Sequence, residues 1–181
     1  MRMAVFDDRR KRGMGSHHAP NQGMTDEWLT PPEIIRALGS FDLDPCCPHN
    51  MPWSTATESY AEPHGLVKPW HGRVWMNPPY GRETKKWVQK LANHGNGIAL
   101  LMARTETGIF FPWVWERADA VLFIKGRLNF YDVHGRRSDK NCGAPSVLVA
   151  YGCENADSLD SCAIAGKVVR LRDRLEEGVA A

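Results

Sequence analysis

The stretch Arg73-Val74-Trp75-Met76-Asn77-Pro78-Pro79-Tyr80-Gly81 changes character in its middle. Residues 73–76 are mostly apolar and favour extended backbone, so they predict a strand that ends at Asn77. The two prolines that follow fix the backbone and lack N–H donors, which predicts a rigid turn after the strand. Residues 83–93 then predict a helix. A strand, a turn and a helix in this order are typical of an α/β sheet.

The rest of the chain repeats this alternation of strands and helices. Predicted strands cover residues 41–44, 97–102, 120–124 and 146–151. Predicted helices cover residues 30–38, a stretch near 108–117, and a charged tail at 168–177. The first helix begins at the capping residue Thr30, has prolines in its first positions and ends at Gly39. Residues 48–71 read mostly as loop and are too short for two βα units. We therefore expect a trimmed, mixed sheet with helices on both faces.

Length and composition limit what the chain can be. Its 181 residues suffice for one domain with a real core, which we place at residues 25–181, after a mobile arm at residues 1–24. Hydrophobic residues make up 43% and charged residues 24%, as in ordinary globular proteins.

No apolar run approaches the roughly 18 residues of a membrane span, and no secretory signal opens the chain. We expect a cytoplasmic protein with no membrane partner. The net charge of +2 neither supports nor excludes nucleic acid.

The five cysteines include the adjacent pair Cys46 and Cys47, which is a poor start for a disulfide framework. The thiols are therefore predicted to be reduced. Together with His49 they raise the question of a zinc site. Structural zinc sites space their ligands as C-x(2–4)-C with a second pair downstream, and this chain has neither feature. We expect buried thiols and no metal.

The turn Asn77-Pro78-Pro79-Tyr80 carries the clearest chemistry. In an open α/β sheet, ligands bind beyond the carboxyl ends of strands, which is where this turn falls. The exocyclic amine of adenine is a weak nucleophile because its lone pair is delocalised into the ring. If the Asn77 side-chain oxygen and the Pro78 carbonyl accept its two N–H groups, the nitrogen becomes pyramidal and its lone pair points at a methyl donor. Tyr80 would stack on the base, at about 1–3 kcal/mol.

Two other interpretations are open at this point. Asn77–Tyr80 also suits a plain turn after a strand, since Asn and Pro favour turns. Pro45-Cys46 has the form of the nucleophile of cytosine-C5 methyltransferases, whose reaction requires a covalent adduct. Glu154-Asn155 mimics the acid-asparagine partner in that family. Against this second interpretation, Cys46 precedes the Asn77–Tyr80 turn, and the upstream glycine-rich segment of such enzymes is missing.

Several further segments, in order, resemble the phage N-6-adenine-methyltransferases, small enzymes related to the Dam-replacing group. The resemblance covers about residues 25–152. Its segments are residues 26–32 (DEWLTPP), 41–45 (FDLDP), 70–81 (WHGRVWMNPPYG), 104–105 (RT), 125–130 (KGRLNF) and 144–147 (APSV). It implies a minimal class I S-adenosylmethionine-dependent methyltransferase fold, Rossmann-like, with the cofactor over the first strand and the target adenine flipped out of the duplex. It also implies a phage or prophage gene in a bacterial host.

The resemblance further assigns roles to single residues. Those implied to be catalytic are Asn77, Pro78, Pro79 and Tyr80. Those implied to contact the cofactor are Trp28, Thr30, Pro31, Asp42, Asp44, Pro45 and Asn77. The loop after Pro45 lacks the glycines with which most such enzymes approach the cofactor, and the small phage enzymes share this gap. The acid that binds the ribose is not identified, and Glu58 and Glu62 are candidates.

Basic residues suggest where double-stranded DNA would bind. Arg104-Thr105 follows a strand beside the catalytic one, where a DNA contact and a helix N-cap by Thr105 are equally open. Residues 125–140 form a basic segment that either contacts phosphates or is a solvated loop. The residues expected to contact DNA are Tyr80, Arg104, Arg127, Arg136 and Arg137. We expect no separate target-recognition domain, so specificity would come from residues 48–71 and 126–143 or from a second subunit. A monomer and a homodimer are both open.

Three functions compete. The first is a DNA adenine-N6 methyltransferase that uses S-adenosylmethionine and no metal. The second is a methyltransferase for RNA or a protein amide, because Asn-Pro-Pro-Tyr alone also occurs in enzymes that methylate protein glutamine or ribosomal guanine. The third is a non-catalytic DNA-binding relative. The intact motif argues against the third function, since DNA binding alone does not require it.

Overall fold

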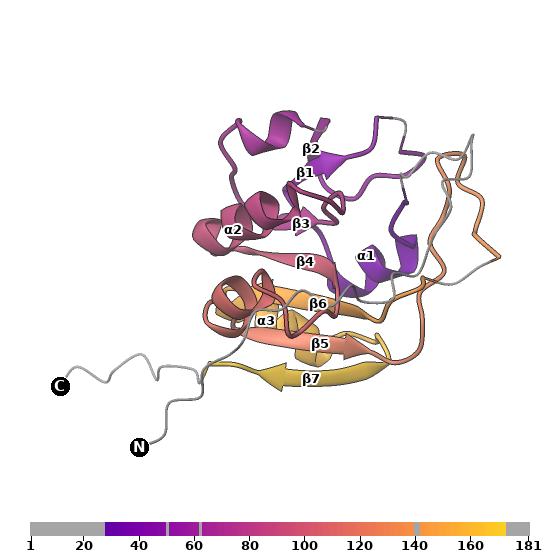
Figure 1. The fold of residues 1–181 in the computed structure, drawn as a ribbon. Helices are drawn as coiled ribbons and strands as arrows, with labels where there is room; N and C mark the ends of the chain where they lie inside the picture. The colour runs from indigo at the N-terminus through magenta and orange to yellow at the C-terminus, as the bar shows by residue number, and fades with distance from the viewer. Residues whose placement is uncertain (1–27, 50, 62, 140–141, 173–181) are drawn as a thin grey trace, which may run out of the picture.

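The computed structural model describes residues 28–49, 51–61, 63–139 and 142–172. Its centre is a seven-stranded sheet with the strand order β2-β1-β3-β4-β6-β5-β7 (Figure 1). In chain order the strands are β1 (Leu43–Cys47), β2 (Glu58–Ala61), β3 (Val74–Met76), β4 (Gly97–Met102), β5 (Ala120–Ile124), β6 (Ser146–Tyr151) and β7 (Gly166–Arg170). The arm predicted at residues 1–24 lies outside the described residues.

The sheet is mixed, as predicted, and the order of its strands changes direction between β1 and β3. Strands β2, β1, β3 and β4 are parallel, whereas β6 is antiparallel to both β4 and β5, and β7 is antiparallel to β5. The chain passes from β1 to β2 on one side and then back to β3 on the other. The carboxyl ends of β1 and β3 therefore flank a topological switch point, where α/β sheets bind their ligands.

Helices cover both faces of the sheet, which confirms the layered prediction. On one face lie α1 (Pro32–Leu38) and α3 (Cys153–Ser161). On the other lie α2 (Thr84–His94) and the π-helical turn η2 (Phe111–Trp115), while the short 3-10 turn η1 (His64–Leu66) follows β2. None of the helices in the described part of the chain is long and apolar enough to cross a membrane.

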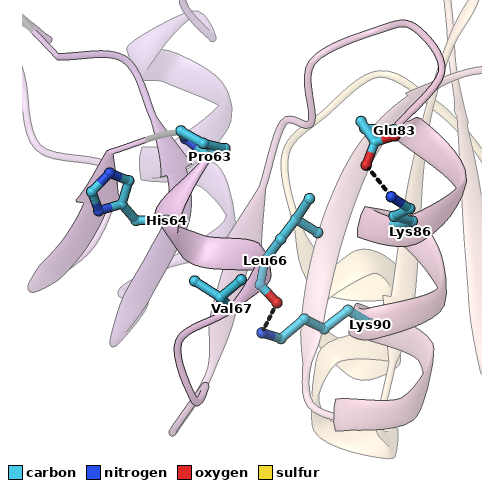
Figure 2. A pocket seen from close by; sticks show the side chains of 7 residues that line it. All are labelled: Pro63, His64, Leu66, Val67, Glu83, Lys86 and Lys90. Atoms are coloured by element: carbon cyan, nitrogen blue, oxygen red, sulfur yellow. Dashed lines mark hydrogen bonds and ion pairs between the residues drawn. The ribbon is translucent and has the colours of Figure 1, made fainter.

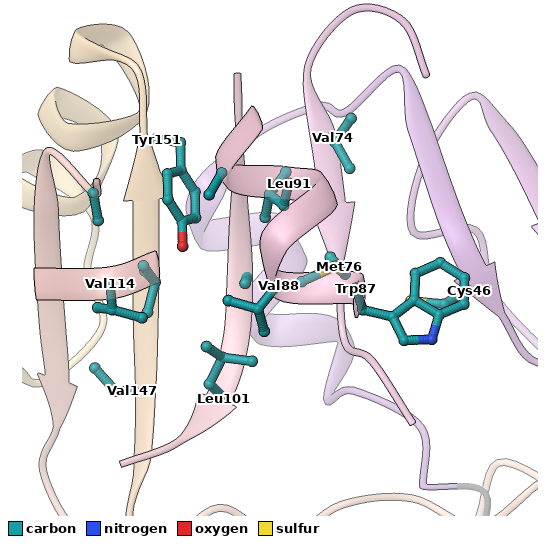
Figure 3. Packing of buried hydrophobic residues seen from close by; sticks show 14 of the residues in the cluster. Cys46, Val74, Met76, Trp87, Val88, Leu91, Leu101, Val114, Val147 and Tyr151 are labelled. Atoms are coloured by element: carbon teal, nitrogen blue, oxygen red, sulfur yellow. The ribbon is translucent and has the colours of Figure 1, made fainter. Parts of the chain in front are cut away.

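Alternating side chains along each strand build a core on each face. In β4, Ile98 and Leu100 join the cluster under α1 and α3, whereas Ala99 and Leu101 join the cluster under α2. Figure 3 shows α2 lying across the strands with Trp87, Val88 and Leu91 among the side chains packed at the sheet. These alternating apolar strands hold the carboxyl edge of the sheet in place.

Arg73 ties several elements together at the opposite, amino edge of the sheet. Its guanidinium group donates to the Asn155 side chain at 2.6 Å and to the Ser158 hydroxyl at 3.1 Å, both on α3. It also donates to the carbonyls of Leu38, the last residue of α1, and Ser40, at 3.0 and 2.9 Å. One side chain thus joins β3 to both helices of that face.

The first strand differs from the prediction. We expected a strand at residues 41–44 that stops at Pro45, but β1 runs from Leu43 to Cys47 and contains the proline. The register of β1 against β2 shifts between Asp44 and Cys47. A proline cannot donate to a neighbouring strand, and this irregularity accommodates it.

Residues 48–71 are mostly loop, as predicted, but they also contain β2 and η1; only Tyr60 of β2 is buried, so that strand carries little apolar pattern. Two further parts of the fold differ from the prediction. The tail, expected to be a helix over 168–177, forms β7 up to Arg170, and residues 173–177 lie outside the described residues. The helix α3 was not predicted, because its buried residues are few and include the polar Asn155. The strands at 97–102, 120–124 and 146–151 are confirmed with the same bounds.

Candidate functional site

The Asn77–Tyr80 turn leaves the carboxyl end of β3, beside the switch point. The buried Thr84, in the first turn of α2, fixes its far end. The Thr84 hydroxyl donates to the Pro79 carbonyl at 2.9 Å and accepts from the Gly81 N–H at 2.8 Å. The prolines supply stiffness and Thr84 supplies the anchor, so the turn presents its polar groups in a fixed arrangement.

The side chain of Asn77 has one satisfied end and one unsatisfied end. Its amide nitrogen donates to the Trp28 carbonyl at 3.2 Å. Its side-chain oxygen is enclosed and meets no hydrogen-bond donor among the described residues. An enclosed acceptor without a donor is costly, and such a group requires an explanation.

Tyr80 exposes its ring and encloses its hydroxyl group. The side chain is 47% exposed, while the hydroxyl donates to the Leu100 carbonyl at 3.4 Å. Desolvation raises the pKa of Tyr80, with the charge of nearby Arg104 opposing that rise. The hydroxyl therefore stays protonated at neutral pH, and the ring is free to stack on a planar partner.

Asp44 is a buried acid on β1, the strand next to β3. It accepts from the Cys46 N–H at 3.1 Å and from the Thr55 hydroxyl at 2.5 Å. Burial raises its pKa from 3.8 to about 6, although both hydrogen bonds oppose that rise. The Cys46 thiol donates to the backbone carbonyl of Asn77 at 3.4 Å, which links β1 to the turn.

The raised pKa of Asp44 predicts a pH-dependent stability. The folded chain holds a proton on Asp44 that the unfolded chain releases between about pH 4 and 6. Stability from this group is therefore full below about pH 4, is lost as the pH rises through about 6, and then stays constant. The loss is about 3 kcal/mol, at about 1.4 kcal/mol per pKa unit.

An Asp44→Asn variant isolates this effect because its amide stays uncharged while keeping the shape of the acid. We expect the free energy of unfolding of the variant, minus that of the wild type, to grow by about 2.5 kcal/mol between pH 4 and 7. Urea unfolding at a series of pH values measures it. A difference that does not change with pH would show that Asp44 titrates as an ordinary exposed acid.

The segment from Trp28 to Pro31 lies along the same edge. Leu29 pairs with Tyr131 through two backbone hydrogen bonds of 2.9 and 3.1 Å. Trp28 is 41% exposed, whereas Thr30 and Pro31 are buried. Thr30 does not cap α1 as predicted: the N-cap residue is Pro31, and no side chain caps the helix.

Two acids predicted to approach the cofactor lie at the other end of the sheet. Asp42 precedes β1 and accepts from the backbone N–H of Arg73 at 2.6 Å, at the amino edge. Glu58 begins β2 and contacts His71 at 2.8 Å, at that same edge. The two acids thus lie at the amino edge, whereas the Asn77–Tyr80 turn lies at the carboxyl edge, and a cofactor contact by either acid stays a prediction. Glu62, the other ribose candidate, lies outside the described residues.

The arginines predicted to contact DNA spread along the carboxyl edge. Arg104 is exposed just after β4, and Arg127 is exposed in the connection from β5 to β6. Arg136 pairs with Asp132 at 2.8 Å, and Arg137 is exposed beside it. The alternative of an N-cap by Thr105 was wrong, since no side chain caps η2.

The cytosine-C5 interpretation fails on geometry. The Cys46 thiol lies at the carboxyl edge, within hydrogen-bond distance of Asn77. Asn155 lies at the amino edge, fully buried, where it donates to Asn96 and accepts from Arg73. The two parts of that proposed site are therefore at opposite ends of the sheet. No group of three or more His, Cys, Asp or Glu side chains in the described ranges could hold a metal ion.

An open groove of about 590 Å³ lies between η1 and the start of α2. Figure 2 shows Leu66 and Lys90 facing each other across it, with the Lys90 amine bonded to the Leu66 carbonyl at 2.9 Å. The same amine donates to the Gly65 and Lys68 carbonyls, so Lys90 ties η1 to α2. None of the predicted site residues lines this groove.

Sequence comparison adds independent information about this arrangement. Residues 17–178 match the family described as DNA N-6-adenine-methyltransferase (Dam). The match spans the Asn77–Tyr80 turn, Asp44 and the basic segment after β5. The comparisons with curated proteins and with solved structures gave no match.

Proposed function

Because the chain belongs to the DNA N-6-adenine-methyltransferase (Dam) family, we propose that the carboxyl edge of its sheet transfers a methyl group from S-adenosylmethionine to the exocyclic amine of adenine in duplex DNA. The observation that carries this proposal is the enclosed side-chain oxygen of Asn77, which has no donor among the described residues. An adenine amine supplies that donor. In a turn with only a structural role, an enclosed acceptor without a donor would lower stability and bring no benefit.

The cofactor fits the edge next to β1, in keeping with a minimal class I methyltransferase fold. S-adenosylmethionine presents ammonium, hydroxyl and amine donors, and the buried Asp44 carboxylate is an acceptor at that edge. The remaining contacts proposed for it come from Trp28, Thr30, Pro31, Pro45 and Asn77. When bound, it supplies an electrophilic methyl group on a sulfonium centre.

The turn activates the amine by position and electrostatics. The Asn77 side-chain oxygen and the Pro78 carbonyl each accept one N–H of the amine, so its lone pair points away from the ring plane. In the transfer, the amine nitrogen would bond to the methyl carbon as the bond from that carbon to sulfur breaks, which leaves S-adenosylhomocysteine, and the nitrogen would release a proton to water. The exposed ring of Tyr80 stacks on the adenine, which must leave the duplex to reach this edge.

The DNA would be held by residues around the edge, without a separate target-recognition domain. Arg104, Arg127, Arg136 and Arg137 are exposed there and suit phosphate contacts. Residues 25–181 would act as a single domain.

A comparison of methyl acceptors tests the proposal against its two alternatives. Labelled S-adenosylmethionine is offered with duplex DNA, with RNA of the same sequence, and with a protein extract lacking nucleic acid. We expect label in DNA and at least tenfold less in RNA or protein. Preferential labelling of RNA or protein would replace the proposal with the amide or RNA methyltransferase. Binding of DNA without transfer to any acceptor would favour the non-catalytic relative.

A further inference from the structure

Residues 131–137 form a compact hairpin, here called the basic hairpin, between β5 and β6. Its ends pair at Tyr131 and Arg137. The Asp132 carboxylate accepts from the N–H groups of His134 and Arg136, each at 2.9 Å, and from the Arg136 side chain at 2.8 Å. These bonds lower the pKa of Asp132, with the Arg136 N–H making the largest contribution. The hairpin is therefore an ordered unit that presents Arg136 and Arg137 to solvent.

The first residue of the basic hairpin connects it to the catalytic turn. Tyr131 exchanges two backbone hydrogen bonds with Leu29. The preceding residue, Trp28, accepts from the Asn77 side chain at 3.2 Å. Only the short Trp28–Leu29 segment thus separates the basic hairpin from Asn77.

A tryptophan from a distant part of the chain packs on the other side of the basic hairpin. The ring of Trp53, on the connection from β1 to β2, meets the Tyr131 ring edge-on, with centroids 5.2 Å apart and an interplanar angle of 80°. Gly135, at φ 74°, approaches Pro52 and Trp53 closely enough that an added Cβ would lie 3.2 and 3.6 Å from them. The indole N–H of Trp53 is enclosed without an acceptor among the described residues, so ring packing fixes its position.

We propose that Trp53 is a positioning residue for DNA, which holds the basic hairpin so that Arg136 and Arg137 reach the phosphates beside the flipped adenine. This inference rests on the proposed function. The edge-on contact between the Trp53 and Tyr131 rings stabilises the basic hairpin in this position. Phosphate contacts set the register of a protein on the duplex, so a displaced hairpin weakens DNA binding and leaves the chemistry intact.

The segment that contains Trp53 also contacts Asp44, which we propose binds the cofactor. Two residues further on, the buried Thr55 donates to Asp44 at 2.5 Å. We therefore expect substitutions of Trp53 and Thr55 to impair two different binding steps. Trp53→Ala acts on DNA binding, whereas Thr55→Val removes the hydroxyl donor of Asp44 and acts on cofactor binding.

The test measures DNA binding directly, by fluorescence anisotropy of a labelled duplex with S-adenosylhomocysteine present, at several salt concentrations. We expect Trp53→Ala to raise the Kd for the duplex about tenfold and to leave the Kd for S-adenosylmethionine within twofold of wild type. The slope of log K against log salt should become shallower by about 0.9 for each phosphate that the variant no longer neutralises. Trp53→Phe, which keeps an aromatic ring against Tyr131, should restore most of the affinity and the slope.

Two arginine variants show whether the effect passes through the basic hairpin. Arg137→Ala should lower DNA affinity and the salt slope in the wild type, and should add little in the Trp53→Ala background. Arg117→Ala is the matched control, because Arg117 is also exposed but bonds to Ala92 at the far end of α2. It should leave both quantities unchanged.

The outcomes separate this inference from the proposed function. Equal duplex affinity and equal salt slope in wild type and Trp53→Ala would overturn the inference, whatever the methylation assay shows. Additive effects of Trp53→Ala and Arg137→Ala would also overturn it, because the two residues would then act independently. A wild type that binds duplex as described but transfers no methyl group would overturn the proposed function alone.

Discussion

Replacing Asn77 by alanine is expected to lower kcat for DNA methylation at least about 100-fold, the usual cost of removing one group that stabilises a developing charge. The variant loses the enclosed oxygen that we propose accepts the adenine N–H, so the lone pair of the amine would stay delocalised into the ring. It also loses the bond to the Trp28 carbonyl, which lies beside the proposed cofactor contacts. We therefore expect a smaller rise, of a few fold, in the Kd for S-adenosylmethionine. Initial rates with saturating duplex and cofactor measure the first effect.

The matched control for this prediction is Asn93→Ala. Asn93 is exposed on α2 and contacts the Arg117 side chain at 3.4 Å, at the opposite edge of the sheet. Its replacement should leave kcat within twofold of wild type. If Asn77→Ala also kept most of the activity, while folding normally, the enclosed oxygen would have no part in the chemistry.

Replacing Gly65 by alanine is expected to give the largest loss of stability, about 3 kcal/mol, at the upper end of the cost of overpacking. A Cβ at this position would lie 1.8 Å from the carbonyl oxygen of Pro45, which is backbone and cannot rotate away. The Gly65 carbonyl itself accepts from Trp70 at 2.7 Å and from Lys90 at 2.9 Å, so η1 cannot slide aside freely. To accommodate the added Cβ, either η1 must separate from β1 or the backbone of Pro45 must shift. The melting temperature should fall by about 10 °C.

Gly108→Ala is the control for that substitution. Apart from its two chain neighbours, no described residue has an atom within 4 Å of a Cβ added at Gly108, and its φ does not lie in the left-handed region. It should change the melting temperature by less than about 2 °C. A Gly65→Ala variant as stable as this control would mean that η1 does not pack on Pro45 as described.

The sequence predicted the strongly apolar parts of the fold well. The strands at 97–102, 120–124 and 146–151 have the predicted bounds because each is buried and rich in branched or aromatic residues. The same logic failed for β7, where Val168 and Val169 lie in a charged tail and the strand forms by pairing with β5 at the sheet edge. Pairing at an edge depends on a distant strand, which a local pattern does not contain.

The candidate site shows a similar division. The Asn77–Tyr80 turn and Asp44 were predicted from short segments, and the structure brings both to one edge. Asp42, which the resemblance implied for cofactor binding, lies at the amino edge instead, because β1 begins at Leu43, two residues later than predicted. The contact between Trp53 and Tyr131 had no sequence signal, since it joins two loops that are far apart in the chain.

The measurement that tests the central claim most directly is the identity of the methylated base. Unmethylated duplex DNA is incubated with the protein and S-adenosylmethionine, digested to nucleosides and analysed by mass spectrometry, with Asn77→Ala alongside. We predict N6-methyladenine from the wild type and almost none from the variant. Methylcytosine at C5 as the product, or equal N6-methyladenine from both proteins, would contradict an adenine site built on Asn77.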